Sequence, residues 1–392
     1  MRVVVDKNNP LVAEAFGQFG EVQALGTKEI TRDSIRDAEM VIVRSQTKVT
    51  EDLLHGSSIR FVGTATIGTE HVDVEYLRAH GIGFASAPGS NANSVAEYIA
   101  AALLTLARRK GIVLHGKTIG VVGVGNVGSK VVRNAQALGM TVLHNDPPLF
   151  RATGDSKFVP LDDLMDADVI TLHVPLISSG TEPTYHLFDS KRIGKMKKGA
   201  ILINTARGSV VDNVALNDAL ERGHLGGSVL DVWEGEPDID RKLLKNVDIA
   251  TSHIAGYSFD GKLAAVKMMY AAACKFFGEE ATWKPENSLP VPKVERIVLP
   301  NTEDSQEESL RRIIDQCYPI ERDDHSLRGI ATVPDEGVRS YFARLRAEYD
   351  VRREFQNTTV EIPSSLGDMR GILIALGFHI ETKEKSKAYA HR

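Results

Sequence analysis

Arg207, Glu236 and His253 are the side chains of this sequence best suited to acid–base chemistry on a small organic acid. They lie in the segments INTARGSVVD, VLDVWEGEP and TSHIAGYS, each at the end of an apolar stretch typical of a buried strand. Oxidation of a secondary alcohol to a ketone delivers a proton to a base, and histidine titrates near neutral pH. We therefore predict that His253 is the acid/base. Glu236 would orient its ring and stabilise its protonated form, and the planar guanidinium of Arg207 would bind a carboxylate.

A glycine-rich turn indicates where the hydride acceptor binds. The sequence GVGNVG from Gly123 to Gly128 follows an apolar strand and opens an amphipathic helix, and Asp146 ends the next predicted strand. In such a turn the glycines allow a tight bend, close approach of a pyrophosphate and close helix–strand packing, while the acid binds the adenosine ribose. A carboxylate there would repel a 2′-phosphate, so we predict NAD rather than NADP. The predicted contacts are Gly123, Gly125, Asn126, Val127, Gly128 and Asp146.

A parallel sheet is the element that would bring these residues together. Short β-branched stretches alternate with helical patterns over the first two thirds of the chain, as expected for βαβ units. Ligands bind outside the carboxyl ends of such strands, so the polar segments should converge there. The predicted strands of this middle region are the apolar start of KTIGVVGVGNVG and residues 141–146, 169–172, 200–204, 227–231 and 249–251.

Composition excludes several classes of function. The 392 residues carry a net charge of −5, which leaves no bulk positive charge for a nucleic acid or an anionic membrane. The two cysteines, Cys274 and Cys317, form no paired motif, so we expect neither disulfides nor a metal site. We find no secretory signal and no apolar stretch of membrane-spanning length, and we expect a cytoplasmic protein.

The motifs NTARG, DVWEGEP and SHIAGY, in that order after a dinucleotide fingerprint, resemble those of the D-2-hydroxyacid dehydrogenase family. The resemblance implies an NAD-dependent oxidoreductase and adds cofactor contacts at Val174, Ala206, Asp231 and Gly256. The family often has a hydroxyl residue at this position. Since valine cannot form a side-chain hydrogen bond, Val174 would act only as an apolar wall or through its backbone. Asp231 would contact the nicotinamide carboxamide, or would instead cap a loop as a strand-end carboxylate.

A narrower resemblance, carried by VRSQTKV, GTATIGTEHVD, PGSNANSVAEY and SHIAGYSFDGK, is to members of this family that act on a small phosphorylated hydroxy acid. It implies that Ser45, Thr66 and Tyr257 contact the substrate. Arg44 and Lys48 are near enough in sequence to supply charge for a phosphate. It also implies that an additional C-terminal domain forms a homodimer.

The fold class expected from these observations is α/β. A Rossmann-type, doubly wound cofactor domain (95–258) would be inserted in a flavodoxin-like substrate domain (1–94 and 259–285). A proline-rich linker, WKPENSLPVP, would lead to a small α+β dimerisation domain (286–392).

Two alternative functions remain open at this point. Another dehydrogenase of the same family, such as one acting on 3-phosphoglycerate, would share Arg207, Glu236 and His253. A non-catalytic NAD-sensing interaction protein would share the cofactor fold, but such proteins tend to have long disordered tails. The residues after Val291 instead alternate apolar and charged residues as a folded domain would.

Overall fold

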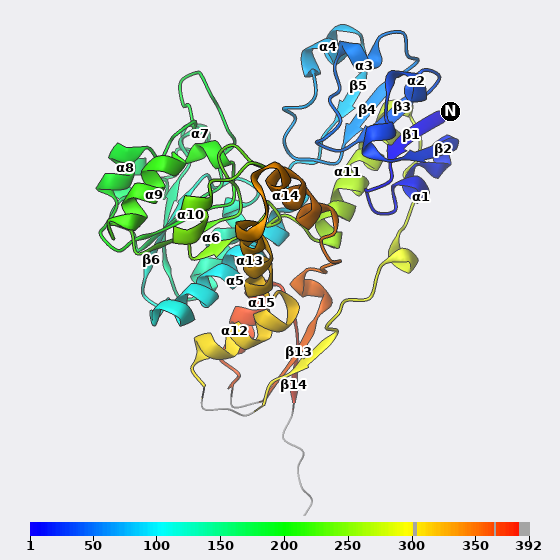
Figure 1. The fold of residues 1–392 in the computed structure, drawn as a ribbon. Coiled ribbons are helices and arrows are strands. Elements are labelled where there is room, and N and C mark those ends of the chain that lie inside the picture. The colour runs from blue at the N-terminus through cyan, green and yellow to red at the C-terminus, as the bar shows by residue number, and fades with distance from the viewer. Residues whose placement is uncertain (301–303, 364–365, 384–392) are drawn as a thin grey trace, which may run out of the picture. The chain divides into compact units, whose positions relative to one another are not determined.

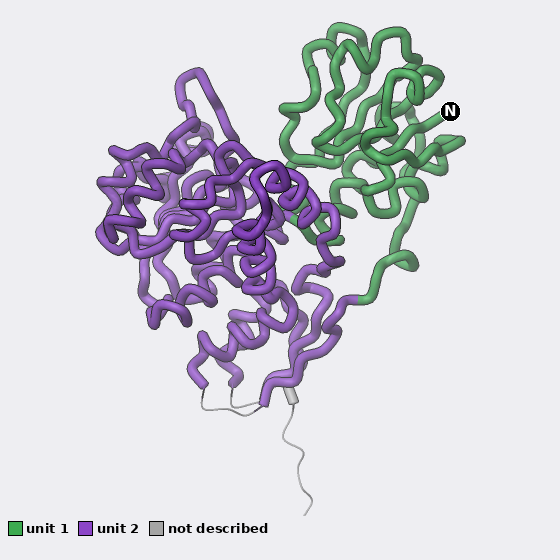
Figure 2. The backbone as a smooth tube through the Cα atoms, in the orientation of Figure 1, with its two compact units in different colours: residues 1–92, 257–291 green, residues 93–256, 292–392 purple. Residues whose placement is uncertain are grey.

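The computed structural model describes residues 1–300, 304–363 and 366–383. The chain forms two compact units, one of residues 1–92 and 257–291 and the other of residues 93–256 and 292–392 (Figure 2). The sequence predicted three units with boundaries near 94, 258 and 285. The difference lies in the C-terminal segment, which shares its hydrophobic core with the cofactor sheet. In the part of the chain that the structure describes, no helix is long and apolar enough to span a membrane.

The first unit is built on a five-stranded parallel sheet in the order β2-β1-β3-β4-β5, the flavodoxin-like order. Alternate residues of each strand face opposite sides, so Val3 and Val5 pack with α1 and α11, while Val4 packs with α2, α3 and α4. The strands are β1 (Arg2–Asp6), β2 (Glu21–Leu25), β3 (Met40–Val43), β4 (Phe61–Thr64) and β5 (Gly83–Ala85). The helices are α1 (Val12–Phe16), α2 (Arg32–Ile35), α3 (Glu51–Leu54), α4 (Val74–Ala79) and α11 (Phe259–Phe277).

The second unit contains a six-stranded parallel sheet in the order β11-β10-β9-β8-β6-β7. Beyond β7, Phe158 forms an isolated parallel bridge with His144, where a Rossmann sheet has its third strand. With that bridge counted, the order is the doubly wound arrangement predicted from the sequence. The strands are β6 (Thr118–Val122), β7 (Thr141–Asn145), β8 (Val169–Leu172), β9 (Ile201–Asn204), β10 (Gly227–Leu230) and β11 (Ile249–Ala250).

Helices cover both faces of this sheet (Figure 1). Ile201 and Ile203 pack on the face covered by α5 and α6, and Leu202 packs on the opposite face with α8, α9 and α10. This alternation is the period of two that buries a parallel strand on both sides. The helices are α5 (Ala92–Lys110), α6 (Gly128–Ala137), α7 (Pro147–Thr153), α8 (Ser190–Lys195), α9 (Asn213–Glu221) and α10 (Arg241–Asn246).

The C-terminal segment has its own three-stranded parallel sheet, in the order β12-β13-β14. It is the α+β segment predicted from the sequence. Its buried residues, such as Phe355 and Val360, belong to the same core cluster as Ile119 and Val121 of β6. The strands are β12 (Arg296–Val298), β13 (Thr359–Pro363) and β14 (His379–Lys383), and the helices are α12 (Gln306–Cys317), α13 (Ile320–Arg328), α14 (Val338–Ala347) and α15 (Met369–Leu376).

Candidate active site

The three glycines of the turn after β6 occupy different environments. Gly123 has φ +85°, and a Cβ atom there would lie 2.7 Å from the carbonyl oxygen of His173. A Cβ on Gly128 would overlap the carbonyl oxygen of Gly123, so glycine is needed for the helix to start this close to the strand. Gly125 is exposed, with open space where its Cβ would be. That is the arrangement a pyrophosphate needs to approach the backbone, and these residues fit a dinucleotide.

Asp146 lies directly beside this turn, at the end of β7. Its Oδ2 accepts a hydrogen bond from the Val124 amide at 2.8 Å, and its Oδ1 caps α7 by accepting from the Leu149 amide at 3.0 Å. The carboxylate is therefore fixed next to the glycine turn. Asn126 is exposed in the turn, and Val127 precedes the first residue of α6 with no side chain capping the helix. The backbone amides at this helix start are suited to an anionic group.

His253 and Glu236 lie in the loops that follow the neighbouring strands β11 and β10 and are hydrogen-bonded to each other. Nδ1 of His253 donates to Oε1 of Glu236, while Oε2 of Glu236 accepts from the Trp233 amide at 3.1 Å. Burial raises the pKa of Glu236. Hydrogen bonding and electrostatic attraction to His253 together lower the pKa by more than burial raises it, so the net shift is downward. The carboxylate is thus ionised at neutral pH, and Nε2 is the ring nitrogen of His253 that does not contact Glu236.

Asp231 organises the loop that carries His253. This buried carboxylate accepts hydrogen bonds from the Thr251 hydroxyl at 2.6 Å and from the amides of Ile254 at 2.8 Å and Ala255 at 3.0 Å. Its own carbonyl accepts from the His253 amide at 2.7 Å. These contacts match the loop-capping alternative for Asp231, and the cofactor contact stays a prediction. The loop holds His253 at φ +58°, a conformation that is uncommon outside glycine.

Arg207 lies in the loop after β9, which packs against the backbone of the Glu236 loop. Buried Asn204 holds this loop through both ends of its amide: Nδ2 donates to the Arg207 carbonyl at 2.9 Å, and Oδ1 accepts from the Ala206 amide at 3.0 Å. A Cβ on Gly208 would overlap the backbone of Trp233, so only glycine allows this close approach. Arg207, Glu236 and His253 are therefore carried by three adjacent strand ends.

The additional cofactor positions lie at the same edge of the sheet. Val174 follows β8 and would touch a Cβ placed on Gly123, so it lies beside the glycine turn. Ala206 is buried in the loop after β9, and Gly256 ends the segment after β11. The carboxyl ends of β6 to β11 thus carry every cofactor residue predicted from the sequence, but whether each contacts NAD stays a prediction.

Arg346 is a candidate functional residue that the sequence did not indicate. It lies near the end of α14, and its charge contributes to lowering the pKa of Glu236, after the larger effect of His253. The C-terminal segment therefore supplies a cation to the environment of the His253–Glu236 pair. No local motif surrounds Arg346, and only the tertiary fold reveals its relation to Glu236.

The predicted substrate residues all belong to the first unit. Ser45 is exposed in the turn after β3, and Thr66 lies two residues beyond the end of the adjacent strand β4. The Thr66 hydroxyl donates to the Gly68 carbonyl at 2.8 Å and lies 2.8 Å from the Thr64 hydroxyl. Tyr257 is the first residue of the returning segment, and the Lys262 ammonium lies 4.5 Å from the centre of its ring. Ser45 and Thr66 thus share one edge of their sheet.

The fold and the residues at the strand ends define an NAD-dependent dehydrogenase of the D-2-hydroxyacid type. The family model for the NAD-binding domain of D-isomer-specific 2-hydroxyacid dehydrogenases matches residues 90–255, and a model described as a domain of unknown function (DUF3410) matches residues 288–370. The erythronate-4-phosphate dehydrogenase of Salinibacter ruber is 47% identical over 92% of this chain and 94% of its own length. That of Chromohalobacter salexigens is 43% identical over 98% of this chain and 100% of its own length. The chain belongs to the erythronate-4-phosphate dehydrogenase family, which confirms the family resemblance and the NAD cofactor predicted from the sequence.

Solved structures agree with this classification. D-Lactate dehydrogenase of Aquifex aeolicus, in complex with NAD and lactic acid, is 28% identical with a TM-score of 0.57, covering 71% of this chain and 96% of its own. NAD-dependent formate dehydrogenase of Staphylococcus aureus, in complex with NAD, is 27% identical with a TM-score of 0.58, again over 71% of this chain and 96% of its own. The fold class predicted from the sequence is confirmed.

Proposed function

We propose that this protein oxidises 4-phospho-D-erythronate to 2-oxo-3-hydroxy-4-phosphobutanoate, a step of pyridoxal 5′-phosphate biosynthesis. The observation that carries the proposal is similarity over more than nine tenths of the chain to enzymes named for this substrate. It is supported by a histidine–carboxylate pair at the strand ends of the cofactor sheet.

His253 is the proposed general base. With Nδ1–H donated to Glu236, its Nε2 is free to accept the proton of the substrate C2 hydroxyl. The ionised Glu236 fixes this tautomer and stabilises the imidazolium that forms. NAD+, when bound, would supply the acceptor for the hydride that leaves C2. The glycine turn, Asp146 and the apolar side chain of Val174 are the residues that would hold it.

Arg207 is proposed to bind the substrate carboxylate. Its guanidinium offers paired N–H donors that match a carboxylate, and its charge would stabilise negative charge on the C2 oxygen. Asn204 and Gly208 act as positioning residues, because they fix the backbone that carries Arg207. Ser45, Thr66 and Tyr257 are proposed as further substrate contacts.

A direct assay tests the reaction. Purified protein with NAD+ and a 2-oxo acid acceptor to regenerate the cofactor is supplied with 4-phosphoerythronate or 3-phosphoglycerate. We expect turnover with the first and at least a hundredfold lower kcat/KM with the second. Turnover of 3-phosphoglycerate alone would overturn the substrate assignment, and turnover of neither would favour the non-catalytic alternative. His253→Ala should lower turnover by orders of magnitude while NADH still binds.

A homodimer formed through the C-terminal segment is part of the proposal. Val298 on the edge strand β12 and Ile374 on α15 are 55% and 53% exposed, as expected for apolar residues covered by a partner. Ile374→Arg should therefore shift the protein from dimer to monomer in sedimentation experiments. Val214→Arg is the control, because Val214 is also an exposed apolar residue but lies on α9, a helix that covers the cofactor sheet and not part of the C-terminal segment. An unchanged dimer in Ile374→Arg would argue against this surface.

We also propose that the protein acts in the cytoplasm. Both cysteines are free thiols, Cys274 buried and Cys317 half-buried, which suits a reducing compartment. Cell fractionation with an antibody against the native protein would test this location.

A further inference from the structure

Tyr98 is a buried tyrosine whose hydroxyl reaches the loop of the proposed base. It ends the segment PGSNANSVAEY and lies on α5, with its side chain fully buried. Its hydroxyl lies 2.8 Å from the hydroxyl of Thr251, the first residue after β11. Thr251 is also fully buried and stands two positions before His253. Helix α5 therefore makes a direct polar contact with the segment that carries His253.

The direction of each hydrogen bond at this contact is fixed. Thr251 has a single hydroxyl proton, which it donates to Oδ1 of Asp231 at 2.6 Å. The Thr251 oxygen must therefore accept in its other bond, so the Tyr98 hydroxyl is the donor there. Burial raises the pKa of Tyr98 well above its ordinary value, so this hydroxyl keeps its proton. Tyr98 thus donates to Thr251, and Thr251 donates to Asp231.

Asp231 passes this support to the backbone around His253. Its carboxylate accepts from the amides of Ile254 and Ala255, and its carbonyl accepts from the His253 amide. Burial raises the pKa of Asp231, against the opposing effects of His253 and of the Thr251 hydroxyl. Hydrogen bonds in a chain strengthen one another, so the Tyr98 hydroxyl favours the charged, loop-holding form of this carboxylate.

The backbone at His253 needs such support. Its φ of +58° is a left-handed conformation that a non-glycine residue keeps only where the surrounding structure fixes it. The carbonyl of Thr251 accepts a further hydrogen bond from the indole nitrogen of Trp233 at 2.9 Å. Trp233 belongs to the loop of Glu236, so Thr251 connects the loops that carry both members of the His253–Glu236 pair.

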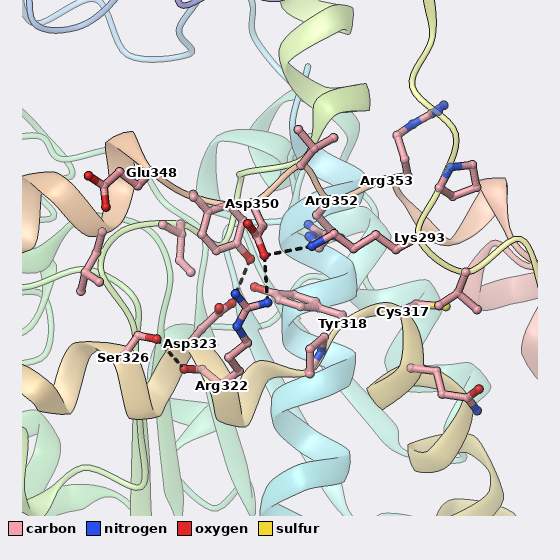
Figure 3. A pocket seen from close by; sticks show the side chains of 18 of the residues that line it. Lys293, Cys317, Tyr318, Arg322, Asp323, Ser326, Glu348, Asp350, Arg352 and Arg353 are labelled. Atoms are coloured by element: carbon pink, nitrogen blue, oxygen red, sulfur yellow. Dashed lines mark hydrogen bonds and ion pairs between the residues drawn. The ribbon is translucent and has the colours of Figure 1, made fainter.

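The C-terminal segment holds the Tyr98 ring in place. The ring centres of Tyr98 and Tyr318 are 6.2 Å apart, and the rings are tilted by 56°. On Tyr318 the guanidinium of Arg352 lies 4.2 Å from the ring centre, and the two side chains lie together beside α5 (Figure 3). Packing therefore leaves the Tyr98 hydroxyl little freedom to leave Thr251.

We propose that Tyr98 is a positioning residue for the dehydrogenase reaction, whose hydroxyl acts through Thr251 and Asp231 to hold His253 in place. The proposal rests on the proposed role of His253 as the base. Tyr98 and Thr251 are buried and would touch neither substrate nor NAD+. Loss of the Tyr98 hydroxyl should therefore lower kcat without weakening the binding of either.

Steady-state kinetics of the full chain with 4-phosphoerythronate test this role, with the active enzyme counted by NADH titration. Tyr98→Phe should lower kcat about tenfold, because a small displacement of a reacting group is costly, while KM and the NADH affinity stay within about twofold of wild type. Tyr341→Phe is the control. It removes another tyrosine hydroxyl of the same unit, which donates to the Ser326 carbonyl at 2.7 Å, and should keep the wild-type kcat.

Two substitutions of Thr251 test the path from Tyr98 to Asp231. Thr251→Val has nearly the same shape but no hydroxyl, and should lower kcat by more than Tyr98→Phe does. Thr251→Ser keeps the hydroxyl and should retain kcat within about threefold. In the double variant Tyr98→Phe/Thr251→Val, kcat should equal that of Thr251→Val alone within about twofold, because the path is already broken. Independent structural effects would instead multiply.

Wild-type kcat in Tyr98→Phe, multiplied losses in the double variant, or an equal loss in Tyr341→Phe would overturn the proposal. A parallel loss of NADH affinity would also overturn it, since Tyr98 would then act on cofactor binding. His253→Ala, measured in the same assay, separates this inference from the proposed function. Turnover retained in His253→Ala would refute the base itself, whereas turnover lost there but unchanged in Tyr98→Phe would refute only the role of Tyr98.

Discussion

Glu236 is anchored at both carboxylate oxygens, one on Nδ1 of His253 and the other on the Trp233 amide. The backbone contact fixes the carboxylate, and the carboxylate in turn fixes the imidazole. The neighbouring acid in the same loop, Glu234, pairs instead with Nε2 of His186 at 2.7 Å. Two glutamates only two positions apart therefore hold two different histidines.

Glu236→Gln should lower kcat by about 10²–10⁴-fold while KM changes little, because the neutral amide cannot stabilise the imidazolium formed on His253. Steady-state kinetics with 4-phosphoerythronate measure this. Glu234→Gln is the matched control and should keep turnover within a fewfold of wild type. Equal losses in both variants would mean that the loop, rather than the charge on Glu236, matters.

Gly125→Ala and Gly128→Ala should fail in different ways. Space is open at Gly125, so its alanine variant should unfold at the wild-type temperature but bind NADH at least tenfold more weakly. A Cβ on Gly128 overlaps the Gly123 carbonyl, so that variant should lose thermal stability. Differential scanning fluorimetry and NADH fluorescence titration separate the two effects. Unchanged NADH affinity in Gly125→Ala would place the pyrophosphate elsewhere.

Asp146→Ser should reduce the preference for NAD+ over NADP+ by at least tenfold, because it removes the carboxylate that repels a 2′-phosphate, while serine still caps α7. The ratio of kcat/KM values for the two cofactors is the measurement. Asp189→Ser makes the same change at the start of α8, where Asp189 accepts from the Arg192 amide at 2.8 Å, and should leave the ratio unaltered.

Asp323 should make stability depend on pH. Burial raises its pKa from 3.8 to about 6, against the lowering effects of the Tyr349 hydroxyl and Arg352. A carboxyl group whose pKa is raised by folding stabilises the folded state. The stabilisation is complete at pH values below the pKa of the group in the unfolded chain, and it is lost as the pH rises through about 6. As the pH rises from 4 to 7, the free energy of unfolding should therefore fall by about 1–3 kcal/mol more in wild type than in Asp323→Asn.

Urea denaturation at several pH values measures this difference. The Asp323→Asn side chain keeps an oxygen acceptor for the Tyr349 hydroxyl, which donates to Asp323 at 2.9 Å, so the comparison isolates the charge. Parallel curves for the two proteins over that pH range would contradict the raised pKa.

The strands and the strand-end residues could be predicted because their signals are local. Val3 to Val5 and Val169 to Leu172 are apolar runs bounded by polar loops, and Gly123 to Gly128 and Asp146 lie within one βαβ unit. Several strand ends shift slightly: β7 stops at Asn145 and β10 at Leu230, each one residue before the predicted end. A residue's place at the end of a parallel strand was enough to group Arg207, Glu236 and His253.

Other features have no local signal. Glu97 and Arg352 are distant in sequence, and neither stands out in its own segment, so the ion pair between them follows only from the tertiary fold. The same is true of the effect of Arg346 on the pKa of Glu236. The core that the C-terminal segment shares with the cofactor sheet was also hidden, because the prolines at 285–292 indicate a linker but not which core the following residues join.

That common core makes the C-terminal segment an internal part of the cofactor unit. From Ser94 to Ala107 α5 is buried on all sides, in the same cluster as β6 of the cofactor sheet and as Phe355 and Val360 of the C-terminal segment. If the segment detached, the apolar residues of α5 that it covers would be left in water. The two parts should therefore fold and unfold in one cooperative transition, and a substitution in β13 should weaken cofactor binding without touching the cofactor. The stability of the C-terminal segment and the affinity for NAD are thus expected to be thermodynamically linked in this chain.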